Sequence, residues 1–308
     1  MTVARRQLIL AGSAAWARAR ALPAESEVKA ELICKVASYC EGVVFDHKGF
    51  VYISHGRQIS RVGPDRVPAR WAETQAPNGH KILGDGTHLV CDGAAKAVLH
   101  LEGNGAVIGK AAEAFDGKPL RGPNDLTLDG AGGFYFTDPA ATSEDRVFHV
   151  ERSGKIHLVA KGLSFPNGIV LRPDGKELLF GESSKNRILK VKVLGAARWS
   201  EPEIFAILPA KGPGQIDNMP DGMCLDAEGN LYVAHWGMRR VQVVDRSGKV
   251  IRGYASGNLT TSNVAFGGVG MDLLYVTGAV EEEKSSEGGL FSLRLPGVRG
   301  LRILAGRG

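Results

Sequence analysis

The chain contains a repeated pattern in which an acidic or amide residue opens a short apolar run. The pattern occurs six times, at intervals of 37, 46, 43, 54 and 42 residues. A period of about 40–45 residues with short strands in each unit is typical of β-propeller blades. The leading residues are Glu41, Asn78, Asn124, Asn167, Asp221 and Asn263. If the repeats are blades, these residues share one register and their oxygen atoms converge in the central channel, which predicts a metal site there.

The fifth repeat shows the strands within one unit most clearly. Its apolar runs at 223–225, 231–234 and 241–244 are separated by turn-forming glycine, aspartate and asparagine residues. Such runs indicate hairpin strands, and no long stretch has the 3.6-residue period of a helix. One four-stranded unit cannot bury both of its faces, whereas six units around an axis can. We therefore expect an all-β, six-bladed β-propeller with four-stranded antiparallel blades around a central metal-binding channel.

A β-sandwich is the alternative fold, because its strands follow one another at similar spacing. A sandwich does not explain the aligned polar residue at the start of each repeat. The repeats fill about residues 41–300 without a gap that resembles a linker, so we expect a single domain over residues 28–308. We expect the ring to close by pairing of an early strand at Val28–Val36 with the end of the chain near Leu301–Leu304.

Residues 1–27 read as an N-terminal tail, for which two interpretations stay open. Arg5-Arg6 followed by an apolar stretch resembles a twin-arginine export signal over residues 1–21, with Ala19-Arg20-Ala21 as a cleavage site. Arg18 and Arg20 interrupt the end of the apolar stretch, which favours a simple tail on a cytoplasmic enzyme. The sequence therefore leaves the location open between cytoplasm and periplasm.

Composition excludes several other classes of protein. The net charge is only +5, and no basic stripe carries interleaved aromatic residues, so we expect no nucleic-acid partner. No apolar run reaches the length of a membrane span, so we expect no membrane partner, and a closed ring is most simply a monomer. None of the four cysteines forms a CxxC pair. We expect Cys91 and Cys224 to be buried, and a disulfide between Cys34 and Cys40 stays open.

Four motifs that occur in order resemble the SMP-30/gluconolactonase/luciferin-regenerating-enzyme family. They are Glu41-Gly42, the segment Arg121–Asp125, the segment Phe165–Ile169, and the long segment Pro220–Gly237. The resemblance covers about residues 35–300. It implies a six-bladed propeller with one divalent ion in its channel, and hydrolysis of sugar lactones or other lactones.

The resemblance also implies which residues bind the metal. Glu41, Asn167 and Asp221 match the metal ligands of the family. Asn124 matches an asparagine beside the metal, which is a ligand in some members and a substrate contact in others. Two carboxylates and two amides form an all-oxygen site, which suits Ca²⁺ first, then Mn²⁺ or Mg²⁺, with some overlap into Zn²⁺ or Fe²⁺. A lone Asx-Gly pair more often marks a turn, as at Asp85-Gly86 and Asp174-Gly175, but the shared register favours the metal here.

Further residues are candidates for substrate binding or catalysis around this site. His80 follows Asn78 by two positions, so strand alternation places both on one face, toward the channel. His80 is then a candidate hydrogen-bond donor or base, and the alternative is a structural histidine satisfied by its neighbours. Arg121 precedes Asn124 by three positions, whereas the family form has an arginine two positions before it, where this chain has Gly122. Asp138 ends a predicted strand and either lines the pocket mouth or caps a turn.

Four other residues complete the set of candidates. We expect His235 and Trp236 to pack between blades. Asp217 and Asn218 lie in the longest interval between repeats and could form a lid over the pocket.

The hypothesis that follows is metal-dependent opening of a lactone ring. A divalent cation would polarise the lactone carbonyl, and Asp221 or His80 would take a proton from the attacking water. The chain has no Gly-x-Ser-x-Gly motif, which argues against a serine nucleophile. Two alternatives stay open: a phosphotriesterase similar to diisopropylfluorophosphatase, and a calcium-stabilised binding propeller without activity. A condensing enzyme similar to strictosidine synthase is less favoured, because it needs no such metal ligands.

Overall fold

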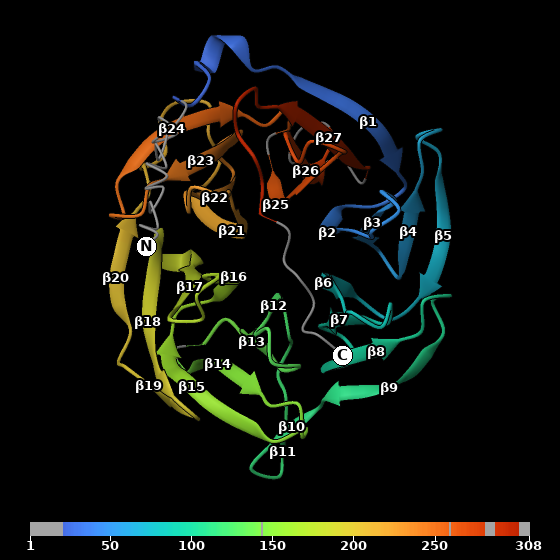
Figure 1. Ribbon diagram of the computed structural model, residues 1–308, viewed down its shortest axis with the longest axis vertical. Coiled ribbons are helices and arrows are strands. Elements are labelled where there is room, and N and C mark those ends of the chain that lie inside the picture. Colours follow the sequence, from blue (N-terminus) through green and yellow to red (C-terminus); the bar gives the residue numbers. More distant parts are fainter. Residues whose placement is uncertain (1–20, 143, 259, 281–286, 302–308) are drawn as a thin grey trace, which may run out of the picture.

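The computed structural model describes residues 21–142, 144–258, 260–280 and 287–301. Six antiparallel sheets stand around a central axis as the blades of a propeller (Figure 1). Among the described residues, the only helical elements are two 3₁₀ turns, Glu25–Glu27 and Ser183–Lys185, and no helix has the length and apolar character that crossing a bilayer requires. The predicted all-β, six-bladed propeller is confirmed.

Each blade runs from an inner strand near the axis to an outer strand at the rim. The first blade contains β2 (Cys40–Phe45), β3 (Val51–His55), β4 (Gln58–Val62) and β5 (Pro68–Glu73). The second contains β6 (Pro77–Ile82), β7 (His88–Asp92), β8 (Ala97–Leu101) and β9 (Val107–Ala112). The third contains β12 (Leu126–Leu128), β13 (Phe134–Asp138), β14 (Asp145–Val150) and β15 (Ile156–Leu163). A small hairpin of β10 (Ala114–Phe115) and β11 (Lys118–Pro119) links the second and third blades.

The other three blades follow the same plan. The fourth blade contains β16 (Pro166–Leu171), β17 (Glu177–Glu182), β18 (Arg187–Gly195) and β20 (Glu203–Ile207), with the short β19 (Arg198–Trp199) beside β18. The fifth contains β21 (Met219–Leu225), β22 (Leu231–Trp236), β23 (Arg240–Val244) and β24 (Val250–Ala255). The sixth contains β25 (Thr261–Gly267), β26 (Leu273–Ala279), β27 (Gly288–Arg294) and β1 (Ala30–Val36).

The sixth blade closes the ring with a strand from the beginning of the chain. The early strand is β1, as predicted, but its partner is β27 and not the segment near Leu301–Leu304. Ala30 lies opposite Leu293 and Val36 opposite Gly288. The prediction of the partner was wrong because β27, the third strand of this blade, already offers its free edge to β1. The amide of Leu301 instead donates to the carbonyl of Leu225, and residues 302–304 lie outside the described residues.

The last residues of the predicted tail pack on the fifth blade. The hydroxyl of Tyr254 donates to the carbonyl oxygen of Pro23 over 3.0 Å, and Arg240 forms an ion pair with Glu25 at 3.0 Å. Leu22 packs against the apolar cluster that includes Tyr254. The export signal predicted for residues 1–21 falls almost wholly outside the described residues and stays a prediction.

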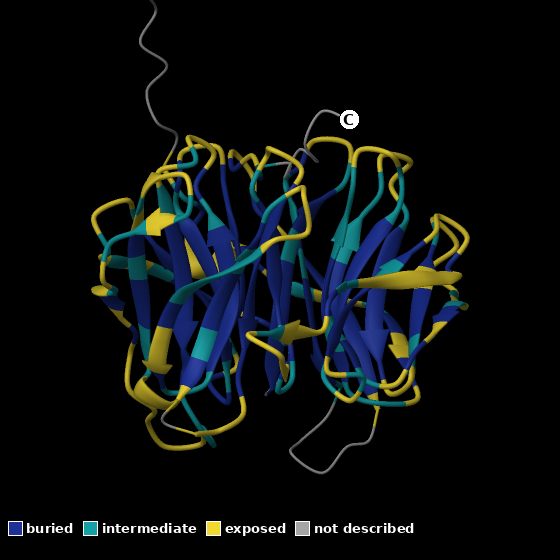
Figure 2. Ribbon diagram, turned by 90° about the horizontal axis from the view of Figure 1, so that it is seen from below, coloured by how far each residue is buried: buried dark blue, intermediate teal, exposed yellow. Residues whose placement is uncertain are grey.

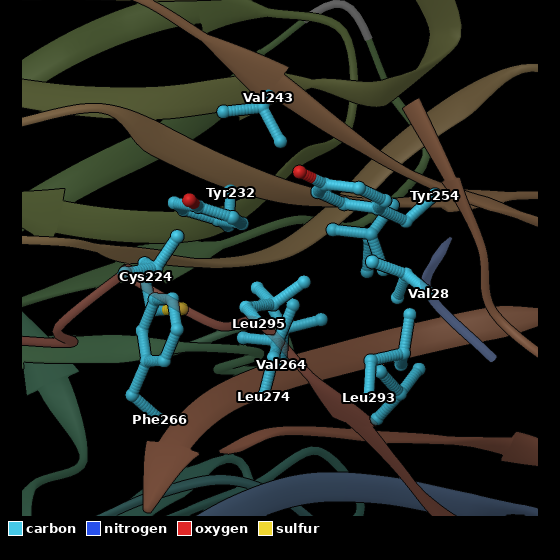
Figure 3. Packing of buried hydrophobic residues seen from close by; sticks show 14 of the residues in the cluster. Val28, Cys224, Tyr232, Val243, Tyr254, Val264, Phe266, Leu274, Leu293 and Leu295 are labelled. Atoms are coloured by element: carbon cyan, nitrogen blue, oxygen red, sulfur yellow. The ribbon is translucent and has the colours of Figure 1, made fainter. Parts of the chain in front are cut away.

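Apolar side chains from neighbouring sheets fill the space between blades. Figure 3 shows this packing between the fifth and sixth blades, where the rings of Tyr232 and Phe266 meet edge to face at 4.9 Å. Most strand residues near the axis are accordingly buried, whereas parts of the outer strands and the loops at both rims are exposed (Figure 2). All four cysteines are buried and free, so the disulfide between Cys34 and Cys40 is not formed.

Five inner strands share a bulge at the position that the sequence repeats mark. The regular pairing is interrupted after Cys40, Pro77, Pro166, Pro220 and Thr261. Adjacent blades are in close contact here. A Cβ atom on Gly42 would lie 2.1 Å from the carbonyl oxygen of Asn78, and one on Gly168 would lie 2.2 Å from that of Asp221. Glycine is therefore required where the inner strands converge.

We expect Gly168→Ala to lower the free energy of unfolding by about 1–3 kcal/mol, the usual cost of overpacking a rigid site. The added methyl group meets backbone atoms of β21, which cannot rotate away as a side chain can. The measurement is urea denaturation in EDTA. Gly109→Ala on β9 is the matched control, because nothing lies within 4 Å of the place where its Cβ would stand. Equal unfolding midpoints for the two variants would contradict this account of the inner strands.

Candidate metal centre and substrate cavity

A cavity of about 420 Å³ opens where the inner strands of the first three blades begin. Its polar lining consists of Ser38, Tyr39, Glu41, His55, Asn78 and Asn124. Five apolar side chains complete the wall: Ala76, Pro77, Pro123, Pro139 and Phe165. Small-molecule sites typically have this size and this combination of an apolar wall with a few convergent polar groups. The cavity therefore has room for a small organic substrate beside Glu41.

Glu41, Asn167 and Asp221 come together from three inner strands, β2, β16 and β21. The side chain of Asn167 hydrogen-bonds the Asp221 carboxylate. Burial raises the pKa of Asp221 well above its ordinary value, and the negative charges of Glu41 and Asp125 raise this pKa further. Burial likewise raises the pKa of Glu41 to about 8, with a further contribution from Asp125. The fold thus gathers carboxylates that repel one another at the axis.

The donor atoms at this position fit a hard divalent cation. The Oε2 atom of Glu41 is buried and has no hydrogen-bond partner. A buried carboxylate oxygen without a partner is costly unless a cation or a proton satisfies it. Within the described ranges, no three Asp, Glu, His or Cys side chains form a metal-binding group by themselves. A set of ligands that contains Glu41 and Asp221 would therefore have to include amide oxygens such as those of Asn124 and Asn167, and this set stays a prediction.

The structure brings Asn78 and Asn124 to the same cavity as Glu41. Their backbones are fixed by neighbouring blades, because Ser54 Oγ donates to the carbonyl oxygen of Asn78 over 2.8 Å and the amide of Gly79 donates to that of Asn124 over 2.8 Å. Both side chains are thus held at the cavity wall by a rigid backbone. Their roles as substrate contacts, and that of Asn124 as a ligand, stay predictions.

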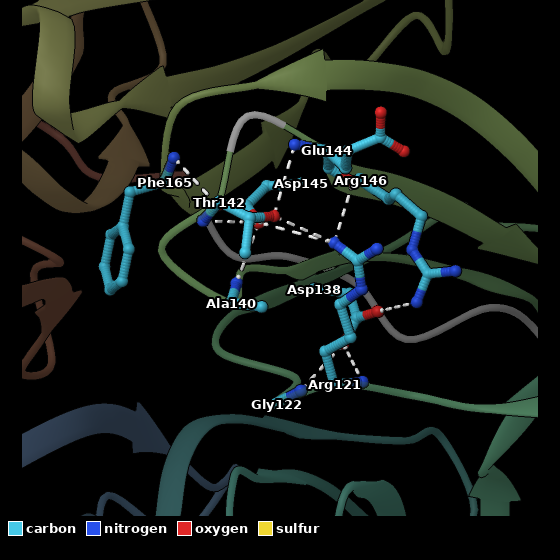
Figure 4. A network of polar contacts seen from close by, with 9 residues as sticks. All are labelled: Arg121, Gly122, Asp138, Ala140, Thr142, Glu144, Asp145, Arg146 and Phe165. Carbon is cyan, nitrogen blue, oxygen red and sulfur yellow. Dashed lines mark hydrogen bonds and ion pairs between the residues drawn. The ribbon is translucent and has the colours of Figure 1, made fainter.

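Arg121 and Asp138 form a structural network beside the cavity and do not line it. The guanidinium of Arg121 donates to Thr142 Oγ1 and to the carbonyl of Glu144, and it lies 3.7 Å from Asp145 (Figure 4). Asp138 is fully buried, and one of its oxygens accepts the amides of Arg121 and Gly122 at 2.9 Å each. Its other oxygen accepts a hydrogen bond from the guanidinium of Arg146 at 2.6 Å, so both oxygens of the carboxylate have hydrogen-bond partners within the protein. Asp138 therefore fixes the segment that leads into Asn124.

His80 lies between two blades and not in the channel. Its ring is fully buried, its Nε2 is 2.7 Å from His88 Nδ1, and it stacks on Trp71. Burial and the neighbouring His88 lower its pKa well below the ordinary value. The alternation that predicted a channel position is broken by the bulge between Pro77 and His80. His80 is not among the described residues that line the cavity beside Glu41.

The remaining predicted residues occupy structural positions. Asn263 fills the space against Gly222, because the bulge of β25 places Ser262 at the position that corresponds to Asp221. His235 is buried and bonds Asn186 of the fourth blade at 3.0 Å, as expected for packing between blades. The loop with Asp217 rests against the turn after β22, where Ile216 donates to the carbonyl of Gly237. A role as a lid stays a prediction.

Several residues at this site were not identified from the sequence. Asp125 is buried beside Asn124, and its negative charge raises the pKa of both Glu41 and Asp221. It stands within one of the four motifs but was not singled out there as a site residue. Lys81 on β6 is its partner. Tyr39 lines the cavity and accepts the indole N–H of Trp236 over 3.0 Å. A single lysine or tyrosine in an apolar strand carries no distinctive pattern, so only the Asn-Asp pair could have signalled part of this group.

Comparison with known proteins identifies the family. The family described as "SMP-30/Gluconolactonase/LRE-like region" matches residues 40–280. The chain belongs to this family. The match spans all six inner strands, from β2 to β25, so it includes each of the residues gathered at the axis.

Two relatives in this family carry names that describe lactone chemistry. A gluconolactonase of Zymomonas mobilis is 28% identical over 67% of this chain and 62% of its own length. The lactonase drp35 of Staphylococcus saprophyticus is 29% identical over 71% of this chain and 70% of its own length. The chain thus spans only about three fifths of that gluconolactonase. Among solved structures, regucalcin of Agrobacterium tumefaciens has the same fold, with a TM-score of 0.75 at 21% identity over 91% of this chain and 97% of its own.

The raised pKa of Glu41 predicts a pH-dependent stability in the metal-free protein. Between its ordinary value of 4.5 and the folded value of about 8, the unfolded chain ionises Glu41 while the folded protein retains the proton. Stability from this group is therefore complete below about pH 4.5 and is lost as the pH rises toward about 8. We expect Glu41→Gln to become increasingly more stable than the original protein over this range.

The measurement is the free energy of unfolding in EDTA at several pH values. The exposed Glu228→Gln is the control and should show no such trend. If the free energies of unfolding of Glu41→Gln and the original protein differ by a constant amount from about pH 5 to pH 8, burial does not raise the pKa of Glu41.

Proposed function

We propose that this protein is a metal-dependent hydrolase that opens the ring of a small lactone. The observation that carries the proposal is the buried, unpartnered Oε2 of Glu41, which lies with Asp221 beside a cavity of substrate size. Membership of a family whose relatives include a gluconolactonase and a lactonase supports lactones as the substrate class.

Glu41, Asn124, Asn167 and Asp221 would hold the cation. Their oxygen donors favour Ca²⁺, and the related fold of regucalcin belongs to a protein described as calcium-binding. When bound, a divalent cation supplies Lewis acidity at the lactone carbonyl and favours ionisation of a nearby water.

The protein residues supply orientation and proton transfer. Asp221 is the candidate general base, because its carboxylate is held by Asn167 and lies near Glu41, which lines the cavity. Asn78 and Asn124 can donate hydrogen bonds to the ring and hydroxyl oxygens of the substrate from the cavity wall. The proline and phenylalanine side chains exclude bulk water from the scissile bond. The product is a hydroxy acid.

Hydrolysis of a panel of lactones that includes gluconolactone tests the proposal. The protein is treated with EDTA and then supplied with Ca²⁺, Mn²⁺ or Zn²⁺. We expect acid release that stops on chelation and returns with one of these ions. Faster turnover of an organophosphate than of every lactone would favour a phosphotriesterase. Tight binding of an ion with no turnover of either class would favour a binding propeller, and both results would contradict the proposal.

We expect Asp221→Asn to remove metal binding and activity together. The substitution keeps the shape of the side chain but removes the charge that a cation needs and the base that accepts a proton. The fall in kcat/KM should exceed the ~10–100-fold typical of changes outside the ligand set. Asp174→Asn in the turn before β17 removes the same charge at an exposed position and should leave both properties unchanged. Full activity in a metal-free Asp221→Asn protein would exclude the proposed mechanism.

A further inference from the structure

The centre of the channel contains three carboxylates and one ammonium group. Glu41, Asp125 and Asp221 lie close enough for their negative charges to repel: Asp125 raises the pKa of Glu41, and both of them raise the pKa of Asp221. Lys81 Nζ lies 3.9 Å from Asp125 Oδ1, and the two side chains are only 13% and 2% exposed. No other lysine or arginine of the described chain forms an ion pair with any of these three carboxylates. The set therefore has a net charge of −2 when all four groups are ionised.

Burial of Lys81 at this position requires an explanation, because a charged ammonium loses favourable hydration there. The separation of 3.9 Å is too long for a hydrogen bond, so the pair does not lock two side chains in one geometry. Asp125 Oδ1 already accepts the amide of Leu126 at 2.8 Å. The contribution of Lys81 is therefore its positive charge and not a specific bond.

The two partners are fixed by the convergence of the inner strands. Lys81 belongs to β6 of the second blade, and Asp125 immediately precedes β12 of the third. A Cβ atom on Gly79 would lie 2.3 Å from Asp125 Oδ1, so the Asp125 carboxylate lies directly against the backbone of β6. Glu41 and Asp221 come from β2 and β21, and neither has an ammonium or guanidinium partner among the described residues. The charge of Lys81 thus offsets that of Asp125, whereas the charges of Glu41 and Asp221 are not offset by a basic side chain that the structure describes.

We infer that Lys81 sets the charge of the channel site, because it neutralises Asp125 and leaves Glu41 and Asp221 to match one divalent cation. This inference rests on the proposed metal site. Without Lys81 the same site would carry −3 and would favour a trivalent cation. Lys81 is a specificity-determining residue in this sense, although it does not touch the cation.

Binding of Ca²⁺ and La³⁺ to EDTA-treated full-length protein tests the inference by calorimetry at constant pH and ionic strength. We expect Lys81→Met to raise the affinity for La³⁺ relative to that for Ca²⁺ by at least about tenfold. Asp125→Asn, which keeps the shape and the Oδ1 acceptor, should weaken Ca²⁺ binding by at least about tenfold. The double variant restores the net charge of −2 and should return the ratio of affinities to within about threefold of the original protein.

Lys190→Met is the matched control, because Lys190 also forms ion pairs with carboxylates, at 3.3 Å and 3.1 Å, but on the outer part of the fourth blade. Circular dichroism in EDTA verifies that each variant is folded, and the near-isosteric Asp125→Asn keeps the test decisive if Lys81→Met does not fold. An original protein that binds one Ca²⁺, with unchanged ratios in all variants, would overturn this inference alone. An original protein that binds neither ion would overturn both the inference and the proposed function.

Discussion

The inner strands of neighbouring blades lie so close together that four of them have no room for a Cβ atom at the glycine of the bulge. Gly42, Gly79, Gly168 and Gly222 each have an atom of the next blade within 2.4 Å of the place where a Cβ would stand. Side chains of the second strands tie these positions together, as Thr137 does by donating to the carbonyl oxygen of Asn167 at 2.8 Å. Glu41, Asn78, Asn167 and Asp221 each directly precede one of these glycines, so the close contact between blades fixes their backbone at the axis.

The convergence has an electrostatic consequence. Like charges in a site of low dielectric repel strongly, so these carboxylates lower the stability of the metal-free protein, and a cation of suitable charge would remove this penalty. Under the proposed function, stability and function are linked, since the atoms that destabilise the metal-free ring are those that would bind the ion. Asp138 and Arg146 show the opposite arrangement outside the cavity, where a buried carboxylate is fully satisfied by the protein at 2.6 Å and 2.9 Å.

The sequence was sufficient to predict the six blades and their inner strands, because the period and the glycines that follow the polar residues reflect the same close contact. It also predicted that Asn78 and Asn124 would meet Glu41. It failed for His80, because a bulge is invisible to an argument from strict alternation. It did not determine where the Arg121 side chain lies, because the direction of a long side chain depends on its partners, here Thr142 and Glu144. Lys81 was missed because its significance comes only from Asp125, on another blade.

Anomalous diffraction from a crystal of this protein soaked in Ca²⁺ tests the central claim most directly. The account predicts one strong peak on the propeller axis, with oxygens of both Glu41 and Asp221 at about 2.3–2.6 Å. Asn167 should contribute its amide oxygen to the same ion. A map without a peak at this position, or with an ion bound elsewhere while Glu41 and Asp221 share a proton, would contradict the account.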